Sequence, residues 1–257
     1  MGQVVSFDIN GKLKKGAGMT VVKDVQSWPG EIMSHLHTSY IGHNLVVNAY
    51  DGYVVVTYLT DDGESTYDER FELPPVGKDS RRPDDMVTLD EKTLVIMGTN
   101  ELLPFTVTWE KDHAVVVFGK AVSFCGPTSI QPEIDNLNST CVAMSYFHQK
   151  GPIHIATRVA CLRGFGEDLT MEVFEQNLYS KNHIFHAMCA LSSTKYVLAK
   201  GIEERSNNSR VTFQVATVHD NGTVTVGEEV KMQHDNFGFF DIDKYVYIHV
   251  HINFIYS

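Results

Sequence analysis

The chain has 257 residues, of which 43% are hydrophobic and 21% are charged, a composition typical of a folded globular domain. Its 32 acidic residues outnumber its 21 basic residues, so the formal net charge at pH 7 is −11. Such a charge repels phosphate backbones and no basic run offsets it, which excludes nucleic acid as an expected partner.

The sequence also lacks the usual signals for a membrane or for export. No stretch approaches the roughly 20 apolar residues that span a bilayer. The first residues do not place a basic segment before an apolar one, as secretory signals do. We therefore expect no membrane span and a cytoplasmic location, or a secreted protein if a leader has been removed.

In chain order, the predicted elements are short strands separated by tight turns. Residues 4–22 begin with a strand and contain Asn10-Gly11, a pair that supplies the positive φ of a hairpin turn. Later turn pairs occur at residues 51–52, 62–63 and 221–222, and strands are predicted at 53–58, 105–109, 154–160 and 211–216. Only residues 167–179 hint at a helical pattern, and we interpret them as an insertion or an outer strand.

Five segments of the chain share a turn followed by an apolar strand. They begin at Tyr40, Leu89, Leu137, Leu191 and Phe240, with spacings of 49, 48, 54 and 49 residues. A repeat of about 50 residues made of short strands predicts the four-stranded blade of a propeller.

In this interpretation, the two ends of the chain together form one blade. Residues 10–16 match residues 221–227 position for position, and the later copy lies between the third and fourth strands of its repeat. The N-terminus thus resembles the outer half of a blade, and residues 239–256 the inner half. Pairing these halves closes the ring and removes exposed sheet edges.

The chain therefore resembles β-propeller repeat proteins in general, without the signature of a specific family. The resemblance implies one all-β domain over residues 1–257, a five-bladed propeller closed by pairing N-terminal outer strands with C-terminal inner strands. The repeats lie near 40–85, 89–132, 137–186, 191–234, and 239–257 together with 1–25. Because residues 246–256 contain no turn residue, a fragment of a larger propeller is the alternative.

The four cysteines form no CxxC pair, which argues against a zinc ribbon or a thioredoxin-type site. Cys141 and Cys161 fall where they face each other across neighbouring strands. We interpret all four as small buried thiols in a reducing compartment.

In a propeller, the innermost strands line a central channel, and the loops that lead into them surround one mouth. About five residues before each repeat start, polar side chains recur. The candidate ligand-binding residues are His35, Asp85, Glu133, His186 and His234. Imidazole and carboxylate groups bind polar ligands or a divalent cation. The alternative is that such loops are polar in any protein.

Other patterns give weaker signals. His35/His37 and His249/His251 have the i, i+2 spacing that places two imidazoles on one strand face, as metal ligands or as an ordinary polar face. No Gly-x-Ser-x-Gly or phosphate-binding glycine motif occurs. Acids available for a glycosidase pair are Asp85, Glu133, Asp135 and Asp241.

We therefore expect a ligand-binding or protein-interaction propeller with a polar channel mouth. Its expected partner is a small polar ligand, with carbohydrate among the candidates, or a protein. The alternative is a glycosidase-like hydrolase or a metal-dependent enzyme that uses acidic and histidine side chains at the same mouth. A divalent cation is the one cofactor considered, and the sequence does not indicate an oligomeric state.

Overall fold

The computed structural model describes ten segments that cover most of the chain. They are residues 2–7, 13–19, 37–50, 52–60, 65–74, 83–126, 129–148, 154–181, 185–203 and 208–235. Within residues 2–7 and 13–19 only the backbone is described.

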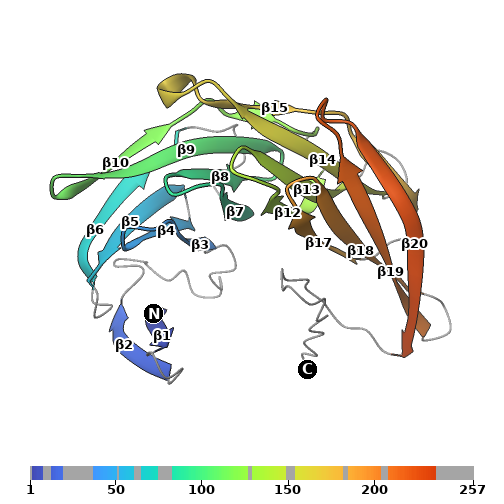
Figure 1. Ribbon diagram of the computed structural model, residues 1–257, viewed down its shortest axis with the longest axis horizontal. Helices are drawn as coiled ribbons and strands as arrows, with labels where there is room; N and C mark the ends of the chain where they lie inside the picture. The colour runs from blue at the N-terminus through green and yellow to red at the C-terminus, as the bar shows by residue number, and fades with distance from the viewer. Residues whose placement is uncertain are drawn as a thin grey trace.

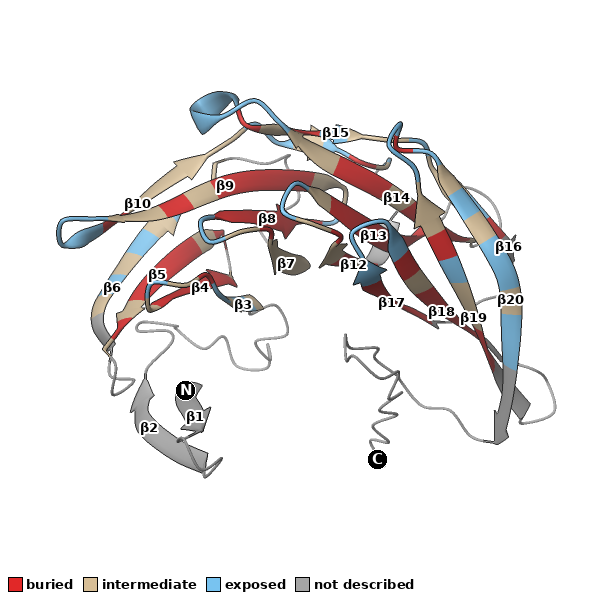
Figure 2. Cartoon of the chain, viewed as in Figure 1, coloured by how far each residue is buried: buried red, intermediate tan, exposed pale blue. Residues whose placement is uncertain are grey.

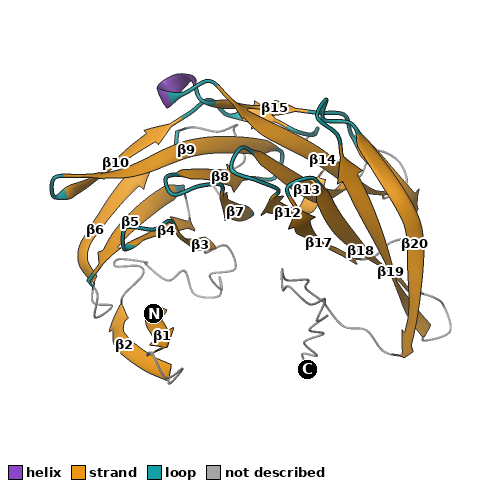
Figure 3. Cartoon of the chain, viewed as in Figure 1, coloured by secondary structure: helices purple, strands orange, loops and turns teal. Residues whose placement is uncertain are grey.

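Four antiparallel sheets follow one another along these segments, each made of consecutive strands (Figures 1 and 3). Sheet I contains β3 (His37–Tyr40), β4 (Leu45–Tyr50), β5 (Tyr53–Leu59) and β6 (Ser65–Glu72). Sheet II contains β7 (Asp85–Thr88), β8 (Thr93–Met97), β9 (Glu101–Glu110) and β10 (His113–Phe118), with β11 (Val122–Ser123) also on β9.

Sheets III and IV continue this order. Sheet III contains β12 (Ser129–Asn136), β13 (Cys141–His148), β14 (His154–Arg163) and β15 (Thr170–Val173), with β16 (Asn177–Lys181) also on β14. Sheet IV contains β17 (Phe185–Ser192), β18 (Lys195–Glu203), β19 (Asn208–Val218) and β20 (Val224–Asp235). A single 3₁₀ turn, η1 (Gly166–Asp168), precedes β15, so residues 167–179 supply outer strands, as one of the two interpretations predicted.

The four sheets stand side by side in an arc (Figure 1). The first strand of each sheet lies on the concave side, and the last strands lie on the convex side. This all-β arrangement of four-stranded antiparallel sheets is compatible with a propeller.

The predicted long strands are present, but each sheet begins one strand earlier than the repeat boundaries suggested. We expected the innermost strand to start at residues such as Leu89 and Leu137. Instead, Leu89 lies between β7 and β8, and Leu137 lies between β12 and β13, so the strands that follow them are second strands. The first strands β3 and β7 have only four residues each and carry polar residues, and for this reason the hydrophobic pattern suggests a loop there.

Within the described segments, the core comprises three apolar clusters, each between two consecutive sheets, and the buried residues lie mainly on the inner and middle strands (Figure 2). Strand β8 illustrates this arrangement, because all five of its residues are buried. Val95 and Met97 face sheet III, while Leu94 and Ile96 face sheet I. Because successive side chains of a strand point to opposite faces, a sheet held between two neighbours needs an unbroken apolar run.

The N-terminal hairpin is formed by β1 (Gly2–Phe7) and β2 (Leu13–Met19), which pair antiparallel. The matching sequence near residue 221 connects β19 to β20, the third and fourth strands of sheet IV, as predicted. Gly222 has a φ of 78° in that turn, a conformation that glycine adopts without strain. Residues 239–256, the predicted partner of the hairpin, lie outside the described residues.

The cysteine interpretation needs one correction. Cys141 and Cys161 do face each other across β13 and β14, but they form a disulfide instead of two free thiols. Cys189 is buried and is not part of a disulfide, as expected, and Cys125 is half-buried and is not part of a disulfide either. Across the described segments, no helix is long and apolar enough to cross a membrane.

Candidate functional site

The structure places the five candidate residues in different settings. Asp85, Glu133 and His186 lie within the first strands β7, β12 and β17, on the concave side, and not in the loops where we expected them. His234 lies near the end of β20, at the opposite edge of sheet IV from β17. His35 lies outside the described residues.

Asp85 connects three sheets through its two carboxylate oxygens. Its Oδ2 accepts a hydrogen bond from the backbone N–H of Ile134 in sheet III, at 3.1 Å. Its Oδ1 accepts from the N–H of Met86 at 2.8 Å and lies 3.3 Å from Nδ1 of His37 in sheet I. Asp85 therefore joins sheet II to both of its neighbours.

The next pair of sheets repeats this arrangement. Oε2 of Glu133 accepts from the N–H of Met188 at 3.0 Å, and Oδ2 of Asp135 accepts from the N–H of Ala190 at 2.7 Å. Both acids belong to β12 of sheet III, and both amides belong to β17 of sheet IV. We call Asp85, Glu133 and Asp135, with the amides that they bind, the carboxylate clamps.

The clamps have a simple physical cause. A first strand pairs with its own sheet along one side only, so backbone N–H groups along its other side need a different partner. A carboxylate of the preceding sheet meets this need with a charge-assisted hydrogen bond, which is stronger than a bond between neutral groups. The acids on the concave side therefore have a structural role.

His186 is buried between sheets III and IV. Its Nδ1 lies 3.0 Å from Oγ of Ser145 and 3.8 Å from Oε2 of Glu133, and its ring packs edge-on against Phe147 with centroids 4.7 Å apart. In a catalytic triad, the hydroxyl and the carboxylate bind opposite nitrogens of the imidazole. Here both approach Nδ1, and Ser145 is fully buried, so this group does not have the geometry of an activated serine.

The structure describes only some of the other residues that we considered as metal ligands or glycosidase acids. Among the residues that the structure describes, no three His, Cys, Asp or Glu side chains gather as metal ligands would. Asp241, His249 and His251 lie outside the described residues. Asp135, which we considered only as a glycosidase acid, is a clamp residue.

Two partners in this region were missed by sequence reasoning. Ser145 lies within an apolar strand, and His37 was considered as a metal ligand or as part of an ordinary polar face. Their contacts reach across 41 and 48 residues of sequence, from Ser145 to His186 and from His37 to Asp85. The repeat spacing of about 50 residues was the one signal that could have suggested such pairs.

No protein-family model matches this chain, and no curated protein matches it in sequence. The functional conclusion therefore rests on the geometry alone.

Proposed function

We propose that the chain forms a closed ring of five four-stranded sheets and acts as a binding module on its concave side. The hairpin β1–β2 would supply the outer strands of the fifth sheet, and residues 239–256 its inner strands. The hairpin pairs from Phe7↔Leu13 to Gly2↔Met19, and its loop sequence matches the loop between β19 and β20. This match supports the assignment to third and fourth strands.

A second feature supports closure. Val197 pairs with Val215, and Ala199 with Phe213, on the face of sheet IV that points away from sheet III. The alternate residues Tyr196 and Leu198 belong to the core shared with sheet III. An apolar outer face on the last sheet is what a further sheet would cover.

The binding proposal rests on the partial exposure and the fixed position of the clamp acids. The side chains of Asp85 and Glu133 are 29% and 38% exposed, although backbone donors hold both carboxylates in place. A carboxylate has about four lone-pair sites, so a positioned acid can accept further bonds from ligand hydroxyl or amine groups. Preorganised acceptors of this kind suit a polar ligand, and a carbohydrate is the first candidate.

The same geometry favours binding over hydrolysis. A glycosidase needs one acid that gives up a proton and a second that attacks or activates water. The carboxylates of Asp85 and Glu133 instead serve as acceptors for the neighbouring sheet, and Ser145 has no access to solvent. For a protein ligand, the acidic net charge of −11 favours a basic surface.

A glycan array probed with the intact chain tests this proposal. We expect binding to a subset of glycans, and Glu133→Gln should weaken it about tenfold, because one charge-assisted bond is worth roughly 1.5 kcal/mol. Asp168→Asn, a change at an exposed acid of η1, which lies on the convex side (Figure 3), is the matched control and should leave binding unchanged. Binding that Glu133→Gln does not alter would contradict the proposed site, and no glycan binding would remove the carbohydrate version.

A further inference from the structure

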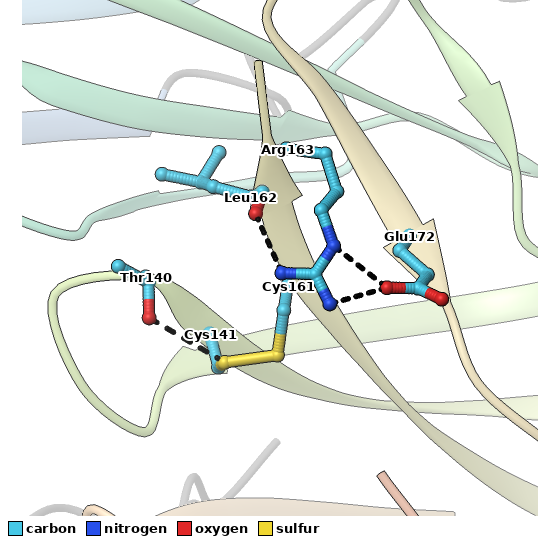
Figure 4. Close-up of polar contacts among 6 residues, drawn as sticks. All are labelled: Thr140, Cys141, Cys161, Leu162, Arg163 and Glu172. Carbon is cyan, nitrogen blue, oxygen red and sulfur yellow. Dashed lines mark hydrogen bonds and ion pairs between the residues drawn. A yellow bond between two sulfur atoms is a disulfide. The ribbon is translucent and has the colours of Figure 1, made fainter. Parts of the chain in front are cut away.

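The disulfide between Cys141 and Cys161 lies at the open end of a hairpin. Cys141 is the first residue of β13, and Cys161 is the third residue from the end of β14 (Figure 4). The strands pair over eight positions, from Cys141↔Cys161 to His148↔His154. The bond therefore secures the end of the strand pair that is farthest from the connection between the two strands.

At the Cys141–Cys161 position, the disulfide joins β13 directly to β14 in place of a backbone hydrogen bond. The adjacent residues Thr140 and Leu162 are joined by a backbone hydrogen bond, in which the N–H of Leu162 donates to the carbonyl of Thr140 at 2.8 Å. The N–H of Cys141 donates instead to Oδ1 of Asn138 at 3.0 Å, within the turn that precedes β13. Cys141 and Cys161 thus form a non-hydrogen-bonded pair, the kind in which opposing side chains come closest.

The disulfide also borders the contact between sheets III and IV. Both cysteines pack against the apolar cluster that these sheets share. In the adjoining turn, Nδ2 of Asn138 donates to the carbonyl of Ser193 in sheet IV at 3.2 Å. A change at Cys141 therefore affects a turn that touches the next sheet.

Neither cysteine of the disulfide is fully buried. Cys141 and Cys161 are half-buried, and the adjacent Thr140 is exposed, with its hydroxyl 3.6 Å from Sγ of Cys141. Arg163 lies two residues beyond Cys161, on the same strand face, where its guanidinium pairs with Glu172 (Figure 4). Glu172 lies directly opposite Cys161 in the register of β14 and β15, so the cation and its carboxylate partner both lie beside the disulfide.

We infer that Cys141–Cys161 is a thiol–disulfide exchange site that controls the contact between the 137–140 turn and sheet IV. The thiolate of a dithiol reductant attacks one sulfur, the Sγ–Sγ bond breaks, and the other cysteine leaves as a thiolate that takes up a proton. The second thiol of the reductant then resolves the mixed disulfide. The protein gains two electrons and two protons, and the reductant becomes a disulfide.

The fold is expected to survive this reaction. The remaining seven register pairs of β13 and β14 and the core between the sheets hold the hairpin without the sulfur bond. Reduction should therefore loosen the open end alone, where residues 137–141 meet Ser193. A disulfide that only stabilises the domain would instead resist mild reductant until the sheet unfolds.

Dithiothreitol titration of the intact chain under native conditions tests the inference. We expect two additional alkylated cysteines by mass spectrometry, an unchanged circular dichroism spectrum, and at least tenfold faster amide exchange at residues 138–141 and 162. Oxidised dithiothreitol, added before the alkylating reagent, should prevent the additional alkylation and restore slow exchange. In Cys125→Ser, which keeps the disulfide, the same response should appear.

Two results would overturn the inference. One is reduction only under conditions that unfold the chain, and the other is an intact mass with four free thiols in protein purified without reductant. The double variant Cys141→Ser, Cys161→Ser supplies a second readout. It should show the fast exchange at residues 138–141 without any reductant, and protected amides there would contradict the proposed control.

Discussion

The interface between sheets II and III and the interface between sheets III and IV share the carboxylate clamps but differ inside. The first is filled by an apolar cluster, in which Phe124 packs edge-on against Tyr146 with centroids 5.2 Å apart. The second contains a buried lysine and a group of buried hydroxyls in addition to its apolar cluster. Apolar packing is non-directional, whereas hydrogen bonds fix the relative positions of their partners.

The polar groups of the III–IV interface are paired with one another. Nζ of Lys200 donates to Oε1 of Gln214 at 2.7 Å and to Oε2 of Glu229 at 2.9 Å. Oγ1 of Thr157 lies 2.8 Å from the hydroxyl of Tyr196. Both interfaces thus have hydrogen bonds between sheets at the concave side, but only the III–IV interior adds a buried bond between sheets, from Thr157 to Tyr196, and a lysine that is bonded within sheet IV.

Replacing Lys200 should have the largest effect on stability among the changes that test this comparison. Lys200→Ala should lower the free energy of unfolding by about 2–3 kcal/mol, because it leaves a cavity and an unpaired Glu229. We place the loss below that of a fully buried pair, since the Glu229 side chain is 29% exposed. Urea denaturation of the intact chain measures it.

The control for this change is a double-mutant cycle. Lys200→Met keeps most of the side-chain volume, and adding Glu229→Gln removes the unpaired carboxylate, so the double variant should recover part of the loss. If Glu229→Gln changes the stability of Lys200→Met by as much as it changes that of the unmodified chain, the two residues are not coupled.

The buried tyrosine should give a smaller effect, visible at alkaline pH. Burial raises the pKa of the Tyr196 phenol well above its ordinary value, and nearby Tyr179 raises it further. The unfolded chain ionises this group near about pH 10, while the folded chain keeps it protonated. Stability from this group is therefore complete below about pH 10 and is lost as pH rises toward the higher pKa of the folded state.

Urea unfolding midpoints measured between pH 8 and 11 test this prediction. Tyr196→Phe should cost about 1 kcal/mol at pH 7, through its bond to Thr157, and should reduce the alkaline loss of stability. If the stability of the variant falls as steeply between pH 8 and 11 as that of the unmodified chain, another group causes the loss.

Much of the strand pattern could be predicted from the sequence, because long apolar runs and turn glycines report local structure. The strands at 53–58, 105–109, 154–160 and 211–216 lie within β5, β9, β14 and β19. The first strands could not be found in this way. Strand β7 has four residues, begins with Asp85 and ends with Thr88, so it has too little apolar pattern to distinguish it from a loop.

Of the five candidate site residues, three lie on the concave strands instead of in the predicted loops, and their binding role stays a prediction. Counting from the repeats selected Asp85, Glu133 and His186, which do lie on the concave strands. Their hydrogen bonds depend on how one sheet registers against the next, as between Asp85 and Ile134, 49 residues apart. Local patterns carry no information on that register. The pairing of Cys141 with Cys161 was visible from spacing, but their oxidation state was not.

Site-resolved amide exchange in two alanine variants tests the carboxylate clamps most directly. We predict that Asp85→Ala speeds exchange at the N–H of Ile134 by about tenfold and leaves Met188 unchanged. Glu133→Ala should do the reverse, so each variant is the control of the other. If neither amide responds to the loss of its own carboxylate, the sheets are not joined by these bonds and the account of the concave side is wrong.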